Sequence, residues 1–187
     1  MPSQDPASIL GNASNDIKAL LVDPRFSFNT LIEGSGQFYT TFAEGVVERI
    51  RISEVSLTHK VAERLNEEAR VVCSIRVEED MINSWGALHG GCSALLVDLC
   101  STLSIAALQM HLTGKPIITV SQAINLVFHA SAFLGEELKI INTSMTVGRR
   151  AVSAQTEIWS ATNHRLVVSG VHVKMTPTRK PTMLTKL

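Results

Sequence analysis

Asn83-Ser-Trp-Gly-Ala-Leu-His-Gly-Gly-Cys-Ser-Ala-Leu-Leu-Val-Asp98 is the stretch that decides the fold of this chain, and it continues as an apolar segment to about residue 112. Apolar side chains fill most faces of a helix drawn through this segment, which is typical of a helix buried in a core or a membrane. Asp98 argues against a membrane span, because an ionised carboxylate in hydrocarbon is costly. We therefore predict a long helix inside a domain core.

The beginning of this helix has the character of an anion site. The first backbone N–H groups of a helix lack intrahelical partners, and the helix dipole favours negative charge beside them. Gly90 and Gly91 carry no side chain, so a ligand atom can approach their amides closely. One interpretation is an oxyanion hole, and the alternative is a Gly-Gly turn needed only for its backbone angles.

Asp98 is the acid of the segment, and it lies far from the helix start. It comes eight residues after Gly90, which is roughly 12 Å along a helix axis. An oxyanion donor and a base that act on one carbonyl must both lie within hydrogen-bond reach of it. Either one of the two residues is idle, or the site forms between two subunits. Two antiparallel copies of the helix across a twofold axis would bring them together, so we predict a homodimer.

Composition narrows the class of protein. The chain has 187 residues, enough for one domain with a real core. Lys plus Arg and Asp plus Glu each count 17, so no basic field suggests nucleic acid. Three cysteines without a CxxC motif fit a reducing compartment. No secretory signal is evident, and the absence of Arg before Arg25 speaks against a mitochondrial presequence. We expect a cytoplasmic location.

The chain divides into three parts. Residues 1–45 read as an amino-terminal extension with a short helix over 16–22, residues 46–176 as the main domain and residues 177–187 as a loose tail. Aromatic residues gather in the extension, which argues against a disordered arm. We expect the extension to pack on the domain or a neighbour; the alternative is a cover over a substrate channel. The aromatic residues are Phe26, Phe28, Phe38, Tyr39 and Phe42.

Strand-like alternation flanks the long helix, with two segments before it and four after it. In the first strand after the helix, alternation puts Ile124 on one face and Ser121 on the other. Short turns between consecutive strands mean antiparallel pairing. An antiparallel sheet of about five to six strands wrapped around one long central helix is an α+β domain with the arrangement of the hotdog fold. The expected strands are residues 47–58, 71–78, 117–128, 138–147, 151–160 and 166–175.

With motif and element order in place, the chain resembles the PaaI-like hotdog acyl-CoA thioesterases over about residues 46–175. The strongest part of the resemblance is Asn83-x-x-Gly-x-Leu-His-Gly-Gly91 followed by Asp98 and Ser101-Thr102. The resemblance implies that an acyl-CoA substrate is hydrolysed to free acid and CoA, without a metal or redox cofactor. It also implies a homodimer that pairs into a homotetramer.

The resemblance assigns roles to single residues. The Gly90 amide would bind the thioester oxygen, Asn83 would orient the substrate or the local turn, and His89 would lie beside them. Asp98 of the partner subunit would act as general base or nucleophile, and Ser121 would help it to place water. Apolar neighbours suit such a base, since partial desolvation makes a carboxylate more basic. The predicted substrate contacts are Gly91, Ser101, Thr102, Phe128, Gly148, Arg149, Arg150 and Lys174.

Several alternatives stay open at this point. Asp98 taken alone also fits a buried acid bonded to Ser101 or Thr102. Arg149 and Arg150 fit contacts to CoA phosphates, through the planar guanidinium, or an ordinary exposed hairpin turn. His172 shares a strand face with Lys174 and is a candidate neighbour of the site, but it belongs to no motif. Rival functions are a non-catalytic acyl-CoA-binding hotdog protein and a hotdog dehydratase or hydratase, although the His-containing motifs of those enzymes are absent.

Overall fold

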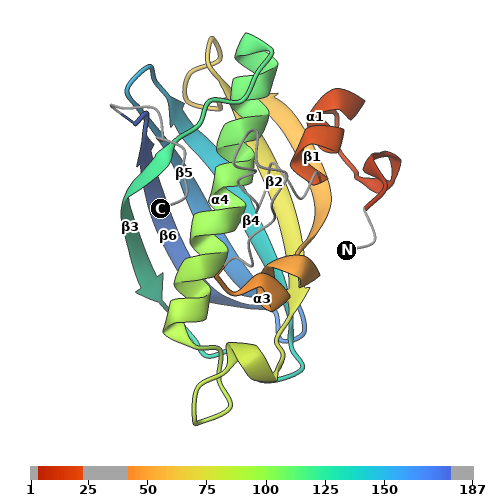
Figure 1. Ribbon diagram of the computed structural model, residues 1–187, viewed down its shortest axis with the longest axis vertical. Coiled ribbons are helices and arrows are strands. Elements are labelled where there is room, and N and C mark those ends of the chain that lie inside the picture. Colours follow the sequence, from red (N-terminus) through yellow and green to blue (C-terminus); the bar gives the residue numbers. More distant parts are fainter. Residues whose placement is uncertain (1–3, 23–41, 178–187) are drawn as a thin grey trace, which may run out of the picture.

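Six antiparallel strands wrap around one long helix in the computed structural model, which describes residues 4–22 and 42–177 (Figure 1). The strands form a single sheet in the order β1-β2-β4-β5-β6-β3, and helix α4 lies across its concave face (Figure 1). This is the predicted α+β hotdog arrangement. The strands are β1 (Arg51–His59), β2 (Glu67–Arg76), β3 (Val120–Phe128), β4 (Glu137–Val147), β5 (Ala151–Ser160) and β6 (Arg165–Met175).

Helix α4 (Gly90–Thr113) has defined ends and an apolar body. His89 caps its start, where the ring Nδ1 accepts a hydrogen bond from the Gly91 N–H over 2.9 Å. Gly114 ends it in the left-handed conformation, with φ of 73°, and its N–H bonds to Met110. By length and composition α4 could cross a membrane. It packs instead against the sheet, with much of its surface buried, as the core helix of the domain.

The inner face of the sheet is set by the alternation of β6. Val168, Gly170, His172 and Lys174 are all buried and pair with buried residues of β5. A Cβ atom added to Gly170 would lie 2.5 Å from Leu126, so only glycine lets β3 approach so closely here. The face with His172 and Lys174 is therefore the one that meets the helix.

Strand β3 departs from simple alternation. A register shift between Ser121 and Ala123 inserts one extra residue, and this reverses the face on which the following side chains lie. Ser121 and Ile124 therefore both point toward the helix, where Ser121 bonds to Asp98 and Ile124 packs on the core. The expectation that they occupy opposite faces was wrong, because a period of two holds only in an unbroken ladder.

Two strand boundaries also differ from the sequence prediction. Residues 47–50 were expected to begin a strand, but helix α3 (Glu44–Arg49) precedes β1. Val46, Val47 and Ile50 are buried, a spacing that suits one face of a helix as well as the start of a strand. Strand β2 begins earlier than expected, since Glu67 already pairs with His59. Only cross-strand pairing, which the local pattern does not reveal, fixes these ends.

The described part of the amino-terminal extension packs on the main domain. The predicted short helix is present as α1 (Asn15–Val22), preceded by the 3-10 helix η1 (Pro6–Ser8). Ile9, Ile17 and Leu21 are buried within the main core. Of the five aromatic residues of the extension, Phe42 is described and is exposed. The other four, and the predicted tail beyond residue 177, lie outside the described residues.

Candidate active site

Asp98 projects from α4 toward the beginning of β3 and the end of β6, and its Oδ1 atom is closely surrounded. The Ser121 hydroxyl donates to Oδ1 over 2.8 Å. His172 Nε2 lies 3.3 Å and Lys174 Nζ 4.0 Å from the same oxygen. Lys174 also donates to the Ser121 hydroxyl over 3.3 Å. Within residues 4–22 and 42–177, Oδ2 has no such partner, and the side chain is 38% exposed. Asp98 thus presents one anchored and one available oxygen.

The Asp98 carboxylate is not a buried acid bonded to Ser101 or Thr102, which was the alternative left open by the sequence. Thr102 donates to the backbone carbonyl of Asp98 over 2.7 Å, not to the carboxylate. Ser101 approaches the same carbonyl at 3.3 Å, and its Oγ lies 2.7 Å from Nδ1 of His172. Ser101 is fully buried, so its hydroxyl faces the interior of the domain. The Thr102 hydroxyl therefore bonds to the helix backbone, and the Ser101 hydroxyl contacts His172 beneath Asp98.

The two basic residues beside Asp98 are buried, and burial lowers the pKa of both. Burial lowers the pKa of His172 to about 4, and the charge of Lys174 adds to this while Asp98 opposes it. Burial also lowers the pKa of Lys174, again against the pull of Asp98. At neutral pH His172 is therefore an uncharged ring. His172 was expected from the sequence as a candidate neighbour of the site without a motif or a role, on the signal of its place on the Lys174 face of β6, and the structure places it beside Asp98.

The start of α4 forms a second cluster. Because Nδ1 of His89 accepts from Gly91, a neutral His89 ring carries its proton on Nε2. The Gly90 N–H has no acceptor within the described part of the chain. Neither glycine has a positive φ. A Cβ on Gly91 would lie 3.1 Å from His89, whereas one on Gly90 would meet only the Phe128 ring at 3.5 Å, an ordinary contact. Backbone angles therefore do not explain Gly90.

Asn83 shapes the loop that leads into the helix. Its side-chain oxygen accepts hydrogen bonds from the N–H groups of Trp85, at 2.9 Å, and Ala87, at 3.2 Å. Gly86, with φ of 75°, closes the turn by donating to the Asn83 carbonyl. The side-chain NH₂ of Asn83 has no acceptor among the described residues. Asn83 thus orders this turn and keeps two N–H donors available.

The predicted site residues therefore fall into two half-sites on one chain. The donor half-site holds Asn83, His89 and Gly90, with Phe128 against Gly90. The acid half-site holds Asp98 with Ser121 and Lys174. Eight helical residues separate Gly90 from Asp98, or roughly 12 Å. One chain does not bring the two half-sites together.

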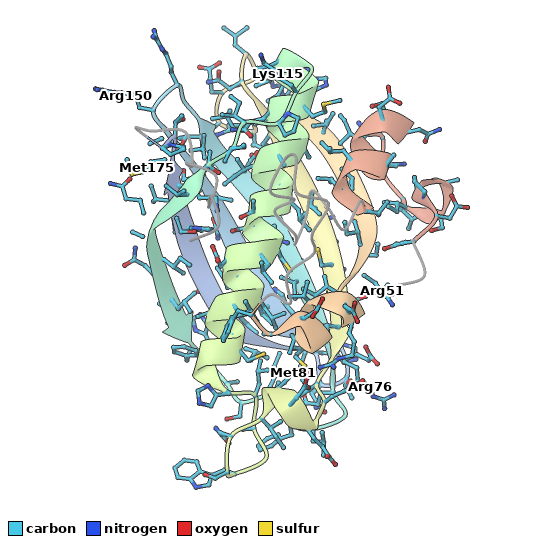
Figure 2. The ribbon with its side chains drawn as sticks, in the orientation of Figure 1. Arg51, Arg76, Met81, Lys115, Arg150 and Met175 are labelled. Carbon is cyan, nitrogen blue, oxygen red and sulfur yellow. The ribbon has the colours of Figure 1, made fainter. Side chains whose placement is uncertain are left out.

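The turn between β4 and β5 lies near the acid half-site. Ala151 pairs with Met175, and Val152 pairs with Lys174. Figure 2 shows Arg150 and Met175 close to each other at one end of the molecule, whereas Met81 marks the opposite end, where α4 begins. Arg149 and Arg150 are exposed there. Gly148 fits the tight turn because a Cβ would lie 2.8 Å from the Ala151 carbonyl.

Comparison with known proteins identifies the family. The sequence model of the thioesterase superfamily matches residues 86–167. Acyl-coenzyme A thioesterase 13 of Mus musculus is 30% identical over 105 residues, which cover 56% of this chain and 71% of that relative. The Homo sapiens protein of the same name matches to the same extent.

Solved structures agree with this result. Thioesterase superfamily member 2 of zebra fish superposes with a TM-score of 0.59 at 27% identity, covering 74% of this chain and 88% of that chain. Its Mus musculus counterpart gives a TM-score of 0.55 at 25% identity, covering 72% and 86%. A hypothetical thioesterase of Streptococcus pneumoniae, solved with coenzyme A, gives 0.57 at 18% identity, covering 74% and 93%, and supports the fold alone.

A sheet wrapped around one helix, shared with solved thioesterases over most of its length, makes this a hotdog-fold protein of the thioesterase class. The chain belongs to the thioesterase superfamily, and the predicted resemblance to PaaI-like thioesterases is confirmed. It is a thioester-hydrolysing enzyme.

Proposed function

We propose that this protein hydrolyses an acyl-CoA to free acid and CoA, and that each active site combines the donor half-site of one subunit with the acid half-site of another. The observation that carries the proposal is the pair of half-sites itself. Among the described residues, the N–H groups of Gly90 and of the Asn83 side chain have no acceptor and Oδ2 of Asp98 has no donor. The donor half-site and the acid half-site lie too far apart in one chain to act on one carbonyl. The name of the relative, acyl-coenzyme A thioesterase 13, supports the substrate class.

The edge of the sheet supplies a route to the dimer. Strand β3 is the last strand of the sheet and pairs only with β6, so its outer edge keeps unpaired backbone groups within the described chain. Unpaired edges favour pairing with another chain. Val120, Val127 and Phe128 on this strand are large, apolar and exposed. A second copy of β3 paired in antiparallel fashion would cover them.

Such a pairing would join the half-sites. If the twofold axis passes through Asn125, this residue faces its own copy, and the extra residue after Ser121 then places Ser121 opposite Phe128 of the partner subunit. Ser121 bonds to Asp98, and Phe128 contacts the position of Gly90. The Asp98 group of one chain would therefore face the Gly90 amide of the other, twice per dimer. We propose this arrangement, with pairing of dimers into a tetramer as a further step.

The proposed reaction begins with polarisation of the thioester carbonyl by the Gly90 N–H and the Asn83 NH₂. Oδ2 of Asp98 takes a proton from water, and the hydroxide oxygen bonds to the carbonyl carbon. When the tetrahedral intermediate collapses, the C–S bond breaks and the thiolate of CoA takes that proton from Asp98. In the alternative route Oδ2 itself bonds to the carbonyl carbon, the C–S bond breaks and CoA leaves as the thiolate. Water then hydrolyses the resulting anhydride to the free acid and the Asp98 carboxylate, and the thiolate takes the proton that this water releases. Neither route uses a metal or redox cofactor.

The two ends of the substrate, CoA and the acyl group, are proposed to lie in different half-sites. Arg149 and Arg150 would contact the CoA phosphates, since they are exposed at the end of the sheet that carries the acid half-site. The acyl group would then extend past Phe128. A cytoplasmic location remains our expectation for this enzyme, in keeping with its free cysteines.

The first test is thiol release from a panel of acyl-CoAs by the wild type and by Asp98→Asn. We expect turnover to fall by roughly 10²-fold or more in the variant, with acyl-CoA binding retained. Asp16→Asn, an exposed acid of α1, is the matched control and should keep full activity. Near-normal turnover of Asp98→Asn would sink the assignment. Binding without thiol release by the wild type would favour an acyl-CoA binder, and hydration of an enoyl-CoA would favour a hydratase.

A further inference from the structure

One buried nitrogen beneath the acid half-site has no hydrogen bond. Nε2 of His172 is fully buried and lacks a hydrogen-bond partner within the described part of the chain. Its nearest counterpart is Oδ1 of Asp98, which lies 3.3 Å away but out of line for a hydrogen bond. Buried polar atoms are normally satisfied, so an unpaired one calls for an explanation. Catalytic hydrogen bonds are often long or misaligned before substrate binds.

The other nitrogen of the ring determines where the proton resides. Ser101 Oγ lies 2.7 Å from Nδ1 and is itself fully buried. If Nδ1 carried the proton, the lone pair of Nε2 would face the Asp98 carboxylate, and two acceptors would oppose each other in a buried place. If Ser101 donates to Nδ1 at 2.7 Å rather than to the Asp98 carbonyl at 3.3 Å, the proton is on Nε2, which lies 3.3 Å from Oδ1 of Asp98. The second arrangement is the one without repulsion.

We propose that His172, held in this tautomer by Ser101, is a positioning residue that anchors Oδ1 of Asp98 and leaves Oδ2 for catalysis. The proposal rests on the proposed function, since it assigns His172 a role toward the Asp98 base. His172 is fully buried beneath the helix and does not touch the substrate in this role.

The surroundings of His172 keep its ring neutral, so that it acts as an uncharged donor toward Asp98. Burial and the neighbouring Lys174 charge hold the pKa of His172 at about 4, so the ring stays uncharged across physiological pH. The positive charge near Asp98 comes from Lys174, and Ser121 supplies a hydroxyl from β3. These are the groups that face the carboxylate from β3 and β6. A neutral donor holds the Asp98 carboxylate in position, and the ring itself does not change its charge near neutral pH.

Two substitutions of His172 test the contributions of its two ring nitrogens separately. The side-chain amide of Gln reaches about as far as Nε2 and presents an N–H donor there, whereas the amide of Asn reaches about as far as Nδ1 and presents an oxygen that accepts from Ser101. His172→Gln therefore keeps a donor toward Asp98, whereas His172→Asn keeps only the contact to Ser101. We expect kcat of the Asn variant to fall about tenfold below that of the Gln variant, with KM similar in both. We also expect the acidic limb of its kcat/KM profile to move up by about one pH unit, because Asp98 loses a donor to its charged form.

Equal kcat and equal pH profiles in two folded variants would overturn the proposal. Nitrogen-15 NMR of the wild-type imidazole provides a test that needs neither activity nor a variant. We expect the His172 proton on Nε2 from pH 6 to 8, and a proton on Nδ1 would overturn the proposal as well. Asp98→Asn is assayed alongside. Full activity in Asp98→Asn means that the proposed function has failed, whereas a dead Asp98→Asn with indistinguishable Gln and Asn variants means that the role of His172 alone has failed.

Discussion

At the scale of the residue, Gly90 is the most informative position because no structural requirement accounts for it. Its φ is not positive, and a Cβ there would make only an ordinary contact with Phe128. Gly91 differs, since a Cβ would press on the capping ring of His89. The sequence alone could not separate the two glycines. The proposed function accounts for Gly90 by close approach of the substrate to its amide, which has no acceptor among the described residues.

Gly90→Ala should therefore fold normally and lose activity. The added methyl group lies where the thioester oxygen would approach the amide, and loss of an oxyanion donor costs roughly 10²-fold or more in kcat. Thermal unfolding and thiol release measure the two properties on one preparation. Gly45→Ala is the control, because a Cβ there meets nothing closer than 3.7 Å in helix α3. Wild-type activity in Gly90→Ala would mean that its amide is not used.

His172 should make the protein sensitive to acid. Its pKa is near 4 in the folded chain and near 6.5 when unfolded, so the unfolded state binds the extra proton between these values. Stability is thus complete above about pH 6.5 and falls by roughly 3 kcal/mol as the pH drops toward 4. Chemical denaturation at fixed protein concentration from pH 7 to 4.5 measures this. His172→Gln should flatten the curve, and an unchanged slope would contradict the assignment.

At the scale of the element, α4 was predictable and β3 only in part. The long apolar run, the glycine at its end and the single acid specify the helix and its burial from local sequence. The extra residue after Ser121 has no local signature, yet it decides whether Ser121 meets Asp98. The helix over residues 44–49 was missed for a related reason, since its short apolar pattern fits two periods. Contacts with the rest of the fold, which the local sequence does not contain, decide both the extra residue in β3 and the helical form of residues 44–49.

The amino-terminal helix α1 should contribute directly to stability. Leu21 is fully buried in the main core, so Leu21→Ala removes methyl groups from a packed interior. We expect a loss of about 2–5 kcal/mol in the free energy of unfolding. Ala19→Ser, at an exposed position of the same helix, is the control and should change stability little. A cost below about 0.5 kcal/mol for Leu21→Ala, the range of surface changes, would show that α1 is dispensable.

At the scale of the whole molecule, the account depends on two chains. The sequence predicted the conflict between Gly90 and Asp98 from helix geometry, and the structure adds an edge of β3 that no other described strand pairs with, with Phe128 at one end and Ser121 near the other. Each half-site has the groups that its role requires, and neither has those of the other. An isolated subunit should therefore be inactive even when folded.

Complementation tests this claim most directly. One chain carries Asp98→Asn, and the other carries Asn83→Ala with Gly90→Val, so each homodimer should be nearly inactive. After subunit exchange between equal amounts, verified by native mass spectrometry, half of the dimers are mixed and each has one intact site. We predict a return of about a quarter of wild-type turnover. Confirmed exchange without any recovery of thiol release would contradict the shared site.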